Sequence, residues 1–107
     1  MTNFSDREAA FETKYARDEE MQFRVTARRN KLVGLWAAEK MGLTAAEAAP
    51  YATSVVQADF EEAGDDDVVR KIVGDLTAAG VEIDSAAVAV LLAEKTVEAR
   101  RQLMESQ

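Results

Sequence analysis

The sequence predicts an all-α protein, a four-helix bundle with a mobile, largely disordered amino-terminal arm. Pro occurs once and Gly five times in 107 residues, a composition that favours helices over the turn-rich sequences of sandwiches and barrels. Apolar residues recur at helical spacing in four blocks, and the short gaps between blocks suit antiparallel neighbours. We therefore expect a single bundle over residues 19–107 and an arm over residues 1–18.

The first block covers roughly Glu19 to Met41, and Gly42 follows it where a left-handed cap residue is expected. Its large apolar residues recur at helical spacing and predict the side that faces the core: Met21, Val25, Leu32, Leu35 and Trp36. Burial is the expected role of Trp36, because it shares this stripe with Leu32.

The second block opens with Thr44 and Glu47 at the spacing of a capping box and ends near Glu62. Its apolar residues are Ala52, Val55, Val56 and Phe60. Pro50 lies six residues past the cap, where it removes a backbone donor. We therefore expect a kink, or a short turn followed by a fresh helix that starts at Pro50.

The third and fourth blocks have clear boundary signals. Asp65, Asp66 and Asp67 favour the positive amino-terminal end of a helix that Gly80 stops. This helix turns Val68, Val69, Ile72, Val73 and Leu76 inward. The last helix begins at Asp84, with Ile83 and Val88 spaced as a hydrophobic staple, and continues through Leu91, Leu92, Ala99 and Leu103.

The arm carries three large apolar residues, Phe4, Phe11 and Tyr15, at spacings of seven and four. At about 100° per residue they form one narrow stripe, which turns polar at Asp18 and Gln22 and lies roughly 80° from the core stripe of the next helix. Either the chain bends near Arg17 to Met21, or the arm leaves its stripe for a partner. A third reading packs the stripe back on the bundle. An isolated segment this short is a marginal helix in water, so we expect disorder that a partner's groove would order.

Composition excludes several classes of function. A net charge of −7 disfavours nucleic acid and membrane surfaces, whose binding depends on Lys and Arg. The chain has neither His nor Cys and no glycine-rich phosphate loop, so we expect no enzyme activity, no cofactor and no metal site. Asp59 to Asp67 is acidic, but Arg70 falls where an EF-hand loop needs its bidentate Glu. The charged start, Asp6 to Glu8, is unlike a signal peptide, so we expect a cytoplasmic protein.

A basic patch on the first helix leaves a second reading open. Residues 24–40 contain one acidic residue, Glu39, and five basic residues: Arg24, Arg28, Arg29, Lys31 and Lys40. The first four of these could hold a nucleotide phosphate in a small-ligand binding module. The structural alternative is that they coat the outer face of the helix or pair with the acidic loop.

Two long runs resemble the zeta inhibitor subunit of bacterial F-type ATP synthases. They extend from Phe11 to Phe23 (FETKYARDEEMQF) and from Ala27 to Lys40 (ARRNKLVGLWAAEK). Shorter blocks look like the same family in the same order: residues 4–8, 58–62, 67–71 and 78–81. The resemblance covers nearly the whole chain, although Pro50 departs from the expected pattern.

The resemblance implies a four-helix regulatory protein with a mobile amino-terminal region. This region enters a catalytic interface of the synthase head, formed by the alpha, beta and gamma subunits, and blocks rotation in the hydrolytic direction. Carried over, the inhibitory element is residues 1–18, with Phe4, Phe11 and Tyr15 as apolar contacts and Arg7, Lys14 and Arg17 as polar contacts. We expect a monomer when unbound, and a cytoplasmic protein peripheral to the inner membrane through the synthase.

Overall fold

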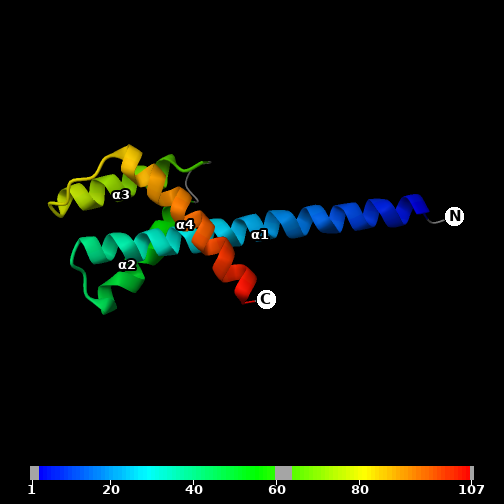
Figure 1. Cartoon of the computed structure of the whole chain (residues 1–107), viewed down its shortest axis with the longest axis horizontal. Coiled ribbons are helices and arrows are strands. Elements are labelled where there is room, and N and C mark those ends of the chain that lie inside the picture. The colour runs from blue at the N-terminus through cyan, green and yellow to red at the C-terminus, as the bar shows by residue number, and fades with distance from the viewer. Residues whose placement is uncertain (1–2, 60–63, 107) are drawn as a thin grey trace.

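The structure, a computed structural model, describes the backbone of residues 3–59 and 64–106 and the side chains of residues 18–59 and 64–106. Its helices are α1 (Asn3–Lys40), α2 (Ala45–Ala58), α3 (Asp66–Ala78) and α4 (Ser85–Glu105). These described ranges contain no strand, so the predicted all-α architecture with four helices is confirmed. Figure 1 shows the carboxyl-terminal half of α1 surrounded by the other three helices, while its amino-terminal half projects from the body.

The first helix is longer than the apolar pattern predicted. Its backbone is helical from Asn3 and passes through residues 17–21 without interruption, so a break of the helix in this region, one of the alternatives that the sequence left open, is not observed. The projection makes the molecule elongated, with extents of 66 × 26 × 20 Å. The expected disorder of the arm in the isolated protein stays a prediction.

The side of α1 that faces the core also differs from the prediction. Of the five residues expected there only Val25 is buried, while Leu35 is 38% exposed and Met21, Leu32 and Trp36 are half-buried. From residue 33 onward the buried positions of α1 are small: Val33, Gly34, Ala37 and Ala38. Small side chains let α2 come close, because a Cβ atom added to Gly34 would lie 2.6 Å from the Cα atom of Ala52. The stripe of large residues therefore flanks the contact instead of forming it.

The second helix has the predicted start but not the predicted interruption. The Glu47 amide donates to the Thr44 hydroxyl at 3.2 Å, and the Thr44 amide donates to the Glu47 carboxylate at 3.0 Å, which confirms the capping box. Pro50 lies inside one continuous helix, so the fresh start there is wrong. The carbonyl that Pro50 leaves without a donor belongs to Ala46, an exposed residue that water can reach. The helix ends at Ala58, and Phe60 and Glu62 lie outside the described residues.

The third and fourth helices follow the prediction closely. Val68, Ile72 and Leu76 of α3 are buried, and Val69 and Val73 pack against the core from its edge. The Asp84 carboxylate caps α4 by accepting from the Ala87 amide at 2.8 Å. Gly42 and Gly80 both have a left-handed φ, of 75° and 84°, and end α1 and α3 as expected. One core cluster joins all four helices: Val33, Ala37, Val55, Val68, Ile72, Leu76, Val88, Leu91 and Leu92.

Candidate functional site

The predicted inhibitory arm forms the projecting end of the molecule. The backbone of α1 from Asn3 onward carries it away from the body as a helix (Figure 1). The side chains of its six predicted contact residues lie outside the described ones: Phe4, Arg7, Phe11, Lys14, Tyr15 and Arg17. Their individual roles therefore remain predictions from the sequence.

The structure does not bring the predicted basic patch together as one exposed site. Arg29 is 7% exposed, and its guanidinium donates to the side-chain oxygen of Asn30 and, at 2.9 Å, to the Asp65 carboxylate. Arg24 is exposed and pairs with Glu20 at 2.6 Å. Arg28 donates to Gln102 of α4 at 3.3 Å, and Lys31 is exposed. The buried member is thus committed to holding α1 against the amino-terminal end of α3.

The sequence left the role of Arg29 open between phosphate binding, the outer face of the helix and pairing with the acidic loop, although its spacing indicated burial. Val25, Arg29, Val33 and Ala37 are four residues apart, and all four are buried. A cation on this row needs a partner inside the protein, and the acidic segment before α3 supplies Asp65. The pairing with the acidic loop that the sequence left open is therefore observed for Arg29.

The remaining acidic residues are held at the start of α3. Asp65 precedes the helix and directs its carboxylate to Arg29 instead of capping the helix. The Asp67 carboxylate lies 3.5 Å from the Arg70 guanidinium. Within residues 18–59 and 64–106, no group of three acidic side chains gathers as a metal site would require. This segment therefore has a structural role at the start of α3.

A polar contact between α2 and α3 also belongs to the scaffold. The Tyr51 hydroxyl donates to the Asp75 carboxylate at 2.7 Å, and the Lys71 ammonium lies 3.0 Å from the same carboxylate. The Lys71 nitrogen is 5.1 Å from the centre of the Tyr51 ring. Burial raises the pKa of the Tyr51 phenol above its ordinary value, and the hydrogen bond and negative charge of Asp75 raise it further. The phenol therefore stays neutral at physiological pH.

Sequence reasoning missed a groove at the base of the arm. It has a volume of about 510 Å³ and lies between α1 and the end of α4. Its lining combines apolar and charged residues: Asp18, Met21, Gln22, Val25, Arg100 and Met104. No pattern within one helix could reveal it, because its walls come from opposite ends of the chain.

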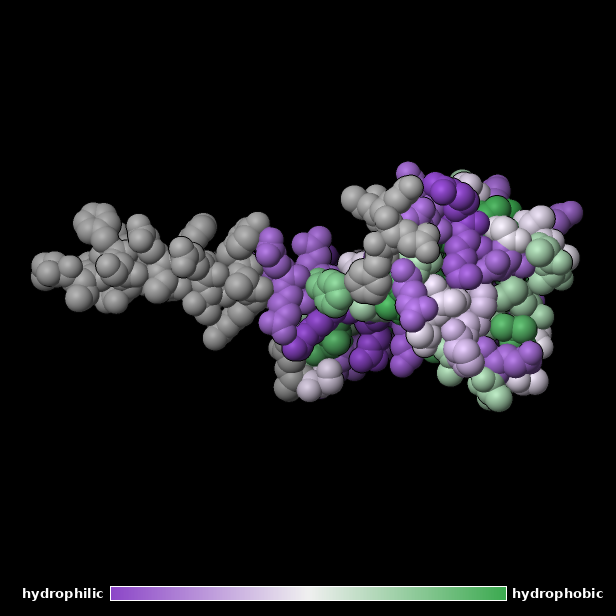
Figure 2. Space-filling view, turned by 180° about the vertical axis from the view of Figure 1, so that it is seen from behind, coloured by the Kyte–Doolittle hydropathy of each residue, from purple (hydrophilic) through white to green (hydrophobic). Residues whose placement is uncertain are grey.

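The rest of the described surface is mixed. Figure 2 shows hydrophilic residues interspersed with small apolar areas over one face of the body. The exposed large apolar residues of the body include Leu35, Val90, Val97 and Met104, and Met104 is the most exposed of these at 71%. None of the helices in the described part of the chain is long and apolar enough to cross a membrane.

A helical body with one long projecting helix defines the chain as a small all-α protein. A sequence model of one family, described as ATPase inhibitor subunit zeta, matches residues 1–102. The chain belongs to this family. The family role is regulatory and non-catalytic, and its name implies interaction with ATP synthase.

A solved structure supports the fold independently. It is described as a solution NMR structure of a protein and is 47% identical to this chain. The match covers 81% of this chain and 99% of the other, with a TM-score of 0.72. No curated protein matches the chain.

Proposed function

We propose that the chain inhibits ATP hydrolysis by inserting residues 1–18 into a catalytic interface of the synthase head. The head consists of the alpha, beta and gamma subunits, and the inserted segment blocks rotation in the hydrolytic direction. The body does no chemistry and serves as an anchor and a stop. The protein is a cytoplasmic monomer when unbound and reaches the inner membrane only through the synthase.

The observation that carries this proposal is the projection of α1 beyond the body. Residues before the groove extend from the bundle as a continuous backbone helix (Figure 1). A helix is the form in which Phe4, Phe11 and Tyr15 share one stripe. A wedge of this kind needs shape and apolar contact, not a nucleophile or a base, which agrees with the lack of His and Cys.

Disorder before binding would give the arm access to its site. Ordering on binding costs about 2 to 5 kcal/mol of the interaction free energy. In return, a flexible segment can enter an interface that opens only at certain rotor angles. Once it is ordered inside the interface, the arm is a rigid helix that blocks rotation.

The test uses full-length variants in an ATP hydrolysis assay with the isolated synthase head. Phe11→Glu places a charge on the aromatic stripe and should weaken inhibition at least tenfold, as loss of an interface anchor does. Thr13→Glu is the matched control, since it lies on the opposite side of the helix. Equal inhibition by Phe11→Glu and the unaltered protein would contradict the proposal. Removal of residues 1–18 should abolish inhibition while the far-ultraviolet circular dichroism of the body persists.

The nucleotide-binding alternative receives a separate test. Titration of the labelled protein with ATP should leave the backbone NMR signals of residues 24–40 unchanged. Shifts confined to Arg24, Arg28 and Lys31 would favour that alternative. Burial of Arg29 against Asp65 leaves these three as the exposed cations of the predicted set.

A further inference from the structure

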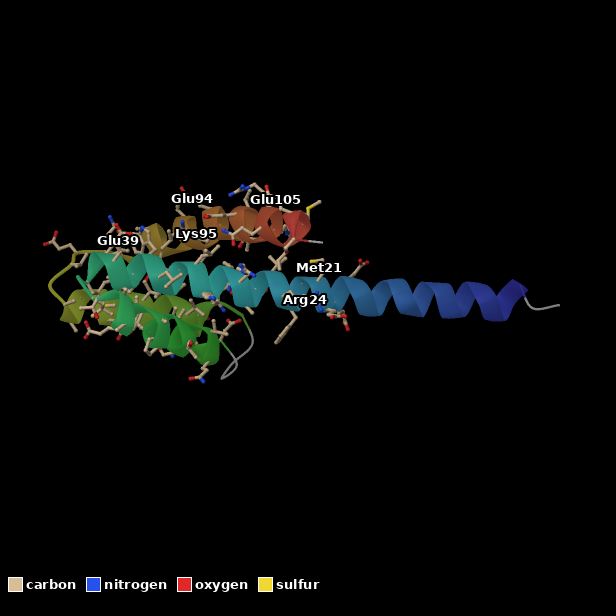
Figure 3. The ribbon with its side chains drawn as sticks, turned by 90° about the horizontal axis from the view of Figure 1, so that it is seen from below. Met21, Arg24, Glu39, Glu94, Lys95 and Glu105 are labelled. Carbon is tan, nitrogen blue, oxygen red and sulfur yellow. The ribbon has the colours of Figure 1, made fainter. Side chains whose placement is uncertain are left out.

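The groove between α1 and α4 lies directly where the arm leaves the body. Asp18, Met21, Gln22 and Val25 of α1 form one wall, and Arg100 and Met104 of α4 form the other. Figure 3 shows the part of α1 with Met21 and Arg24 beside the end of α4, where Glu105 lies. A protein that holds the arm therefore has this groove within immediate reach.

The groove offers apolar surface that the fold leaves uncovered. Met104 in the groove is 71% exposed, and Val97, which lies one heptad earlier on α4 beyond the lining of the groove, is 69% exposed. Because seven residues complete almost two helical turns, these two side chains lie on one stripe of α4. Met21 is half-buried across the groove, and Val25 is 5% exposed. Methionine side chains are flexible and polarizable, so they adapt well to a partner's apolar surface.

The groove contains one cation, Arg100, for which the described residues provide no ion-pair partner. Arg100 is exposed and forms no ion pair or hydrogen bond with the described part of the chain, although Asp18 lines the same groove. Its neighbour Arg101 pairs with Glu105 at 3.3 Å, and Lys95 pairs with Glu98 at 3.2 Å. A guanidinium beside an apolar surface suits a carboxylate from another molecule, because arginine can bind carboxylates through two parallel hydrogen bonds.

The groove also continues the predicted contact stripe of the arm. At helical spacing the stripe of Phe4, Phe11 and Tyr15 extends to Asp18 and Gln22. Both of these residues line the groove. A partner that follows the aromatic stripe along α1 therefore arrives at the edge of the groove formed by Asp18 and Gln22, and Met21 lies about 100° farther round the helix, inside the groove.

We propose that this groove is a second docking surface for the protein that the arm engages. Its occupant is an amphipathic segment of the synthase head that inserts an apolar side chain between Met21 and Met104 and presents a carboxylate to Arg100. This inference rests on the proposed function. The groove fixes where the body stops, and so sets how far the arm enters. A second copy of this chain is a poorer occupant, since each copy carries a net charge of −7.

The first experiment measures the affinity of full-length variants for the isolated synthase head. Met104→Ser and Arg100→Glu should each weaken binding about tenfold, the usual effect of losing an anchor at an interface. Leu35→Ser and Arg101→Glu are matched controls, because they remove an exposed apolar side chain and an exposed arginine outside the groove. The controls should bind within about twofold of the unaltered protein. Thermal unfolding checks that all four variants are folded.

The second experiment uses the methionine methyl groups as reporters. The chain has four methionines, and Met21 and Met104 line the groove whereas Met41 packs against the core at the other end of α1. Addition of the head should shift the methyl signals of Met21 and Met104 more than that of Met41. Equal shifts at all three would contradict a docking surface in the groove.

The outcomes separate this inference from the proposed function. If the unaltered protein inhibits the head, but Met104→Ser and Arg100→Glu bind as tightly as it does, the groove is not a docking surface and the arm acts alone. If the unaltered protein neither binds nor inhibits, both proposals fall. The inference also falls if the unbound protein is a dimer that Met104→Ser dissociates. It falls equally if Phe11→Glu shifts the Met104 signal in the unbound protein, since the arm itself would then fill the groove.

Discussion

The backbones of α1 and α2 approach each other closely at Gly34. A Cβ atom there would meet the Cα of Ala52 at 2.6 Å and its Cβ at 3.1 Å. Backbone atoms cannot move aside as a flexible side chain can. The chain therefore keeps a glycine inside a helix, where glycine costs about 1 kcal/mol relative to alanine.

Gly34→Ala should lower the free energy of unfolding by about 1 to 3 kcal/mol, as overpacking of a filled core does. Gly74→Ala is the matched control, because Gly74 also lies in a helix but nothing stands within 4 Å of its added Cβ. This control should raise stability by about 0.5 to 1 kcal/mol, through the better helix propensity of alanine. Urea unfolding of both variants measures the difference. Equal stabilisation by the two substitutions would show that α1 and α2 do not pack at Gly34.

The stability of the body should depend on pH in the alkaline range because of Tyr51. Its pKa is raised above the ordinary value of 10.0 by burial, so the folded protein holds the neutral phenol. The resulting stability is complete below pH 10.0 and is lost as the pH rises toward the folded pKa. Tyr51→Phe should remove this loss between pH 9 and 11 and, through its missing hydrogen bond to Asp75, cost about 1 kcal/mol at pH 7. Urea unfolding across this range tests it.

Tyr15→Phe is the control for this pH dependence, since the chain has two tyrosines and the other lies in the arm. It should leave the alkaline loss of stability unchanged. An unchanged pH profile in Tyr51→Phe would instead assign the loss to another group.

The ends of the helices were predicted better from the sequence than the sides that face the core, because the residues that cap or stop a helix lie next to its end. The capping box at Thr44 and Glu47, the cap at Asp84 and the glycines that end α1 and α3 all lie within a few residues of the boundary they define. Pro50 misled the prediction, because its cost depends on whether water reaches the carbonyl it leaves without a donor. Ala46 is exposed, so water can reach its carbonyl, and this exposure is known only from the folded structure.

The cap of α2 should be worth about 1 kcal/mol, so Thr44→Ala should lower the free energy of unfolding by that amount. The hydrogen bonds from Thr44 hold the pKa of the Glu47 carboxyl below its usual 4.5. The stabilisation from this carboxylate is therefore present above pH 4.5 and lost as the pH falls through the folded pKa. Thr53→Ala is the control, because this exposed residue lies inside α2. Comparable losses from both substitutions in urea unfolding would argue against a cap.

The core-facing side of α1 was predicted poorly for a related reason. The large residues Leu35 and Trp36 suggested an interior stripe, yet the closest contact uses Gly34, Ala37 and Ala38. A search for periodic apolar residues picks out the side of a helix that carries large side chains, whereas closely packed helices meet through small residues. The burial of Arg29 was missed for a similar reason, since its partner Asp65 is 36 positions away in the sequence.

At the scale of the whole molecule, the sequence predicted the arm but not the groove. The arm is one continuous segment, so the spacing of Phe4, Phe11 and Tyr15 is visible without a fold. The groove joins Met21 to Met104, and only the antiparallel return of α4 brings these residues together. Local pattern therefore predicted the first proposed contact surface, and tertiary structure was needed to find the candidate for the second.

The arm should be ordered by its target. In the isolated protein, the amide protons of residues 1–18 should exchange with solvent almost as fast as in an unfolded peptide, because a helix of this length without tertiary contacts is marginal. Binding to the synthase head should slow their exchange at least a hundredfold. Hydrogen exchange read by mass spectrometry measures both states. Slow exchange at Phe11 and Tyr15 in the isolated protein would show that the stripe is already packed.

Once the arm is ordered on its target, an uninterrupted α1 also fixes the rotation of the arm about the helix axis relative to the body. Each residue turns an α-helix by about 100°, so a one-residue insertion between Gln22 and Val25 would swing the aromatic stripe to a different azimuth while lengthening the rod by only about 1.5 Å. A seven-residue insertion would restore the azimuth to within about 20° but move the tip outward by about 10 Å. Insertions of graded length would thus separate the torsional alignment of the inhibitor from its reach.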